Sequence, residues 1–171
     1  MNDFSYILDV NDVADGGRDF AFAASPEECA ALGQRLGLRK LVSFEVSGQI
    51  QPLSDGRTIL VQGGFVAEVV QSCVVTLDPV ESRLEDTFEI RYVPGGDGAV
   101  ATESDVEVSP DDGDVEPFDG QSIDLGAVAA EFLSLALDPY PRKSGVEFTF
   151  DTAPERDLGP FAGLAKLRNK V

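Results

Sequence analysis

The feature that most constrains the fold is a succession of strand-like segments in the first half of the chain. Residues 41–51 alternate between apolar and polar side chains, and residues 58–70, 71–77 and 80–92 follow as further strand-like runs. An Asp55-Gly56 pair between the first two runs is typical of a tight turn. Because strands joined by short connections pair with their neighbours in sequence, this succession predicts an antiparallel β meander.

The alternation also predicts which side chains of residues 41–51 share a face. One face holds Val42, Phe44, Val46, Gly48 and Ile50, and the other holds Leu41, Ser43, Glu45, Ser47 and Gln49. The adjacent glycines Gly63 and Gly64 predict a bend with a bulge in the return strand. Two shorter runs, 5–10 and 146–150, are interpreted as a first and a last strand, which makes about five to six strands in all.

The first of two main helices has a well-defined start signal. Ser25 is a candidate N-cap, Pro26 takes the first helical position and Glu28 completes a capping box. Apolar residues then recur at helical spacing until Gly37, where the helix is expected to end.

A second helix is predicted over residues 127–137, with Asp124 as its N-cap and Pro139 just after its end. A short amphipathic helix is predicted over residues 159–171, with an apolar side formed by Phe161, Leu164 and Leu167. These elements together predict an α+β fold in which the antiparallel meander packs with two main helices and a short C-terminal helix.

Charge is the unusual property of the composition. The chain has 13 Lys and Arg against 31 Asp and Glu, which gives a net charge of -18. Between Arg91 and Arg142 there are twelve acidic residues and no basic one. We interpret residues 94–120 as an acidic flexible loop inserted in a single domain that spans residues 1–171. Such a surface repels phosphate backbones over most of its area and attracts basic proteins.

The residue types argue against most catalytic and metal chemistry. The chain has no histidine, which removes the commonest general base and metal ligand at neutral pH. Cys29 and Cys73 are too far apart in sequence for a zinc-finger spacing, and no P-loop or EF-hand pattern is present. We therefore expect neither a cofactor nor a metal, and we do not expect an enzyme.

The sequence shows no export signal and no apolar run long enough to cross a bilayer. We therefore expect a cytoplasmic protein that has no membrane partner and whose cysteines are free thiols.

One segment, residues 69–80, places a single cysteine at the end of a strand and follows it with Thr76-Leu77-Asp78-Pro79-Val80. It resembles the bacterial YceD family, also called DUF177. Three further segments match the family in the same order, namely 88–94, 123–141 and 160–167. The resemblance implies a role in accumulation of the large-subunit ribosomal RNA and in assembly of the large ribosomal subunit. Many relatives carry Cys-x-x-Cys where this chain has Cys73-Val74-Val75-Thr76, so the resemblance does not supply a paired-thiol or metal role here.

Three functional hypotheses follow. In the first, a non-catalytic assembly factor binds a basic ribosomal protein or a large-subunit assembly factor through its acidic loop, and contact with ribosomal RNA is indirect. The acidic candidates are Asp105, Glu107, Asp111, Asp112, Asp114 and Glu116. Phe161 and Leu164 are candidate apolar anchors, and Lys166 and Arg168 are candidate basic contacts with the partner or with RNA.

The second hypothesis is direct RNA binding by a small basic patch. Its candidates are Arg35, Arg39, Lys40, Arg142, Lys143, Lys166, Arg168 and Lys170. The third is an enzyme that acts on a small cationic substrate, which the abundance of carboxylates leaves open. The partner's identity, the oligomeric state and the order of the strands do not follow from the sequence.

Overall fold

A computed structural model describes residues 4–14, 16–95 and 114–147. Its elements in chain order are β1 (Ile7–Asp9), the 3-10 turn η1 (Val10–Asp12), β2 (Arg18–Ala23), α1 (Pro26–Arg35), β3 (Lys40–Pro52), β4 (Ile59–Ser72), β5 (Pro79–Pro94), β6 (Asp114–Phe118), β7 (Ser122–Asp124) and α2 (Leu125–Ala136). The α+β class and the two main helices are confirmed.

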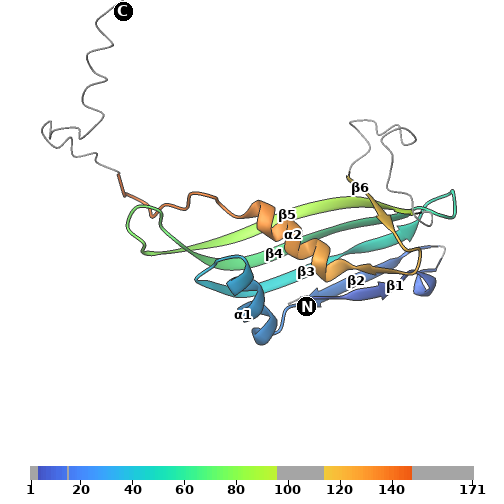
Figure 1. Ribbon diagram of the computed structural model, residues 1–171, viewed down its shortest axis with the longest axis horizontal. Helices are drawn as coiled ribbons and strands as arrows, with labels where there is room; N and C mark the ends of the chain where they lie inside the picture. The colour runs from blue at the N-terminus through green and yellow to red at the C-terminus, as the bar shows by residue number, and fades with distance from the viewer. Residues whose placement is uncertain (1–3, 15, 96–113, 148–171) are drawn as a thin grey trace, which may run out of the picture.

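The main sheet has the strand order β2-β3-β4-β5-β6 (Figure 1). The strands from β2 to β5 are antiparallel, as the meander predicts, but β6 pairs with β5 in parallel. The prediction of a wholly antiparallel sheet is therefore wrong at this edge. The physical reason is the long connection between Gly95 and Asp114, because a parallel neighbour requires a crossover that a short turn cannot supply.

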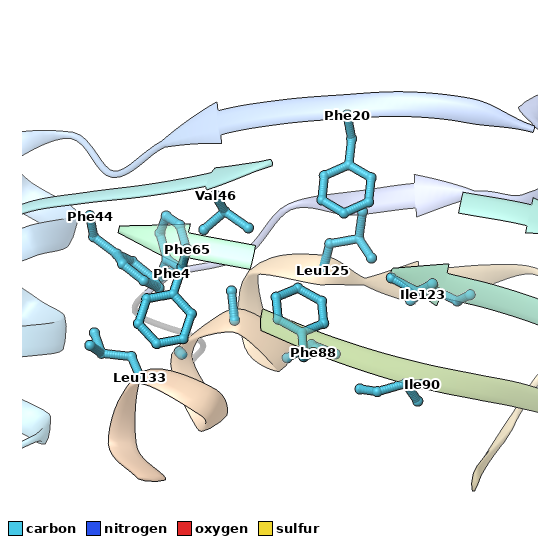
Figure 2. Close-up of a cluster of buried hydrophobic side chains, with 14 of the residues drawn as sticks. Phe4, Phe20, Phe44, Val46, Phe65, Phe88, Ile90, Ile123, Leu125 and Leu133 are labelled. Atoms are coloured by element: carbon cyan, nitrogen blue, oxygen red, sulfur yellow. The ribbon is translucent and has the colours of Figure 1, made fainter. Parts of the chain in front are cut away.

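Both helices pack on the same face of the sheet. α1 contacts β3, and α2 contacts β4, β5 and the small antiparallel pair formed by β1 and β7 (Figure 1). The space between the layers is filled by buried apolar side chains, several of which Figure 2 shows pointing inward from both layers. The fully buried members include Leu32, Phe44, Ile90, Leu125 and Leu133.

The predicted helix caps are confirmed. The Ser25 side chain accepts from the Glu28 N–H at 3.2 Å, and the Glu28 carboxylate accepts from the Ser25 N–H at 2.8 Å. Asp124 caps α2 by accepting from the N–H groups of Gly126 and Ala127, both at 3.1 Å. The same carboxylate accepts from the Tyr6 N–H at 2.9 Å, so it also ties the N-terminal segment to the start of α2.

The bulge lies at Val42 and not at the predicted glycine pair. The pairing of β3 with β4 shifts between Leu41 and Ser43, whereas Gly63 and Gly64 remain in regular register. Because the extra residue reverses the alternation, Leu41 is buried and Val42 is 47% exposed, the opposite of the prediction for these two positions.

Two further predictions about the strands need correction. Residues 71–77 are not a separate strand, because β4 continues to Ser72 and a turn follows. Within the predicted acidic loop 94–120, Asp114–Phe118 forms β6, which is held by its pairing with β5 and by a ring contact at 6.0 Å between Phe118 and Tyr92. Strand β2 was not predicted.

Some predictions fall on residues that the structure does not describe. They are the helix over residues 159–171 and most of the strand over residues 146–150. In the described ranges, no helix has both the length and the apolar character needed to span a bilayer.

Candidate functional site

Only two of the predicted partner-binding residues lie among the described residues. Asp114 and Glu116 are on β6, at the edge of the sheet. The other eight, Asp105, Glu107, Asp111, Asp112, Phe161, Leu164, Lys166 and Arg168, lie outside the described residues.

The two β6 carboxylates belong to a larger group that we name the acidic edge, which consists of Asp114, Glu116, Asp124 and Glu131. Glu116 is opposite the buried Tyr92 in the sheet and accepts a hydrogen bond from the Tyr92 hydroxyl. Burial raises the pKa of Tyr92 well above its usual range, and the negative charges of Glu116, Glu131 and Asp124 raise it further. The acidic edge therefore concentrates negative charge from β6 and from the start and middle of α2. Of its members, Glu116 also binds the Tyr92 hydroxyl of the neighbouring strand.

A second acidic surface lies on the face of the sheet that the helices leave uncovered. We name it the open face. Its acidic members are Asp19, Glu45, Glu68, Glu81, Glu85 and Glu89, and its basic members are Lys40, Arg83 and Arg91. Arg83 lies 4.0 Å from Glu85, and Arg91 lies 3.9 Å from Glu89.

A shallow depression of about 520 Å³ lies at the centre of the open face. Small residues, Ala21, Ser47 and Gly64, lie opposite one another across three strands and form its floor, with Glu45 and Glu85 beside them. This depression could receive a side chain or a short segment of another molecule.

The turn between β4 and β5 carries the segment with the most individual sequence. The chain after α2 packs against this turn and the end of β4 through hydrogen bonds that include three to or from the backbone. The Val74 N–H donates to the Pro141 carbonyl at 2.9 Å, the Lys143 N–H donates to the Cys73 sulfur at 3.5 Å, and the Gln71 side chain donates to the Asp138 carbonyl at 2.9 Å.

The surroundings of Cys73 favour its thiolate. Its side chain has no solvent-exposed surface, because the turn and the chain after α2 cover it. A hydrogen bond from the Thr76 hydroxyl, followed by backbone hydrogen bonds from Lys143 and Thr76, lowers the pKa of Cys73 to about 6. Burial instead raises the pKa of Cys29. Both cysteines are free thiols, and no group of three candidate metal ligands occurs within the part of the chain that the structure describes.

The same turn brings together basic residues that are distant in sequence. The Arg39 Nε donates to the Ser72 hydroxyl at 2.9 Å, and the Lys143 Nζ lies 3.1 Å from the Asp78 carboxylate. Three exposed apolar side chains belong to these two segments, namely Val74, Leu77 and Tyr140. We name this surface the tip and define it by Arg39, Val74, Leu77, Tyr140, Arg142 and Lys143.

The tip joins three of the residues proposed for a basic patch, which are Arg39, Arg142 and Lys143. No sequence pattern indicates that Arg39 approaches Arg142 and Lys143, because about a hundred residues separate them. The exposure of Val74 and Leu77 was also missed, since both continue an apolar run that alone indicates a buried strand.

A model of a protein family described as "Large ribosomal RNA subunit accumulation protein YceD" matches residues 61–168, well over half of the chain. The matched region begins within β4 and contains the turn between β4 and β5, the acidic edge and α2. No curated protein and no solved structure gave a significant match.

Proposed function

The chain belongs to the YceD family of large ribosomal RNA subunit accumulation proteins, and from this premise we propose that it supports assembly of the large ribosomal subunit as a non-catalytic factor that binds a basic protein. The partner class is a basic ribosomal protein or a basic assembly factor. The same proposal places the protein in the cytoplasm, and the influence on ribosomal RNA that it exerts through this partner is indirect.

The observation that carries the proposal is the unbroken acidic run between Arg91 and Arg142. Four of its twelve carboxylates form the acidic edge, and six more, from Asp97 to Asp112, belong to the connection between β5 and β6. One end of this connection, Gly95, donates to the Phe118 carbonyl of β6, and the other end, Asp114, is itself a member of the acidic edge. Negative charge concentrated in this way attracts Lys- and Arg-rich chains and accelerates their encounter with the protein.

The first test is recovery of partners by the tagged protein from its host at low salt, with and without RNase. The expected result is a basic protein of the large subunit, or a basic assembly factor, that is retained after RNase treatment. Retention should weaken as salt is raised, because the Debye length falls from about 10 Å at 0.1 M to about 3 Å at 1 M. Recovery of no such protein would refute the proposal.

Two variants with equal charge locate the binding surface. The first replaces the six carboxylates of the connection with amides, and the second does the same for the six carboxylates of the open face. Each variant changes the net charge from -18 to -12, since six negative charges are removed. Neither change shortens the chain or removes β6. We expect the connection variant to lose the partner and the open-face variant to keep it. Equal loss in both would show that net charge alone attracts the partner.

A further inference from the structure

The tip differs from the rest of the molecule in both polarity and charge. Val74 is 46%, Leu77 68% and Tyr140 71% exposed, and these are three of the six large apolar side chains that are most exposed in the described part of the chain. Arg39 and Lys143 are bound to this turn through Ser72 and Asp78, and Arg142 precedes Lys143, in a protein whose net charge is -18. Exposed apolar groups gathered in this way mark an interaction surface.

The backbone at Tyr140 is held by hydrogen bonds, although the core does not use the Tyr140 ring. Prolines precede and follow it, its N–H donates to the Asp138 carboxylate at 2.8 Å, and the next carbonyl, that of Pro141, accepts from Val74. An exposed aromatic ring on a rigid turn provides a platform on which a nucleic-acid base can stack with little loss of conformational freedom.

Two positive charges that could contact the phosphates beside a stacked base follow this ring closely in sequence. Arg142 is exposed and is two residues from Tyr140, and Lys143 follows it. Asp78 balances one of these charges through its ion pair with Lys143.

We propose that the tip is a contact site for single-stranded RNA, in which Tyr140 stacks on a base, Val74 and Leu77 flank it, and Arg39, Arg142 and Lys143 face the phosphates. The tip and the acidic edge lie at opposite ends of β5, because the turn at the tip precedes Pro79 whereas β6 pairs with Ile90–Pro94 (Figure 1). One molecule would then be able to hold RNA at one end and a basic protein at the other. This inference goes beyond the proposed function and does not depend on it.

The test uses the purified full-length protein and a fluorescein-labelled oligouridylate of about 12 nucleotides, within the usual site size of such surfaces. Fluorescence anisotropy would measure the Kd at several salt concentrations. We expect Tyr140→Ala to weaken binding about tenfold, which is the effect typical of removing one stacked base. Arg142→Gln should weaken binding and reduce the slope of log K against log salt by about one.

The matched control is Arg57→Gln. It makes the same charge change at an exposed position in the turn between β3 and β4, which is at the other end of β4 from the tip. It should bind RNA like the wild type. Thermal unfolding of each variant would establish that the fold is intact.

Three outcomes would overturn the proposal. They are no measurable RNA binding at low salt, unchanged binding in both tip variants, and an equal loss in Arg57→Gln. A fourth outcome would make the tip a protein-docking surface. In that outcome, Tyr140→Ala leaves RNA binding unchanged but abolishes recovery of a protein after RNase treatment. Because the RNA measurement contains no partner protein, its failure leaves the proposed function untouched.

Discussion

Leu77 combines two properties that are each unfavourable for a leucine. Its φ of 60° lies in the left-handed region, where the Cβ of most residues is crowded, and its side chain is 68% exposed. Among the described residues it is the only one other than glycine with a positive φ. Its N–H donates to the Cys73 carbonyl at 2.9 Å and closes the turn, so the backbone has a structural role that does not need the leucine side chain. An exposed leucine side chain on a strained backbone is consistent with contact between this side chain and RNA, which the tip proposal requires.

Leu77→Asn should keep or raise the free energy of unfolding, by up to about 1 kcal/mol, because asparagine tolerates this conformation better than leucine does. The control is Leu135→Asn, which changes an exposed leucine within α2. There the same substitution should lower the free energy of unfolding by roughly 0.5 kcal/mol through helix propensity. Urea denaturation measures both. A larger loss in Leu77→Asn than in Leu135→Asn would show that the Leu77 side chain stabilises the turn.

Gly48 and Gly63 have no side chain, so aromatic rings from the neighbouring strands can pack directly against the backbone of the sheet at these two positions. A Cβ on Gly48 would lie 2.6 Å from the Gly63 Cα and 2.7 Å from the Phe20 ring, and a Cβ on Gly63 would lie 2.6 Å from the Phe88 ring. Gly48 and Gly63 are paired across β3 and β4, so one gap in the sheet receives a ring from β2 and another from β5. Figure 2 shows Phe20 and Phe88 directed toward each other, with Leu125 close by. The glycines thus serve packing, which explains why no bulge forms at Gly63.

Gly48→Ala should destabilise the protein by about 1–3 kcal/mol, since the added methyl group overlaps both a backbone atom and a packed ring. Ser47→Ala is the neighbouring control, because Ser47 is exposed on the open face, and its effect should stay within about 0.5 kcal/mol. Chemical denaturation distinguishes the two. A Gly48→Ala protein as stable as the wild type would show that the sheet and the Phe20 ring adjust without cost.

Ion pairs compensate few of the charges in the part of the chain that the structure describes. Three ion pairs occur among the described residues, Arg83 with Glu85, Arg91 with Glu89 and Lys143 with Asp78, and all are at least partly exposed. Exposed pairs contribute little to stability. At a net charge of -18 the folded state is therefore opposed by repulsion among carboxylates that unfolding would relieve.

Raising sodium chloride from about 0.01 M to about 1 M should therefore raise Tm, because the Debye length falls from about 30 Å to about 3 Å and repulsion is screened. Chloride is preferable to sulfate, which stabilises proteins through exclusion from their surface. The open-face variant, with a net charge of -12, should show a smaller rise. A Tm that falls with salt would mean that favourable ion pairs outweigh the repulsion.

The elements of this protein follow from local sequence patterns. The capping box at Ser25, the N-cap at Asp124 and the alternation from Phe44 to Ile50 each depend on neighbouring residues, and the structure confirms all three. The acidity and the absence of histidine are likewise properties of composition, and they already favoured a binding protein over a catalyst.

The pairing and the contacts of segments that are distant in sequence were decided by the tertiary structure. Contacts across the sheet decide the parallel pairing of β6 and the bulge at Val42. Contacts between segments up to 70 residues apart bring Arg39 to Ser72 and Lys143 to Cys73. No local pattern encodes such contacts, because they form only where burial of the shared core brings the segments together. For this reason the sequence identified basic residues, whereas only the folded chain assembled three of them into the tip.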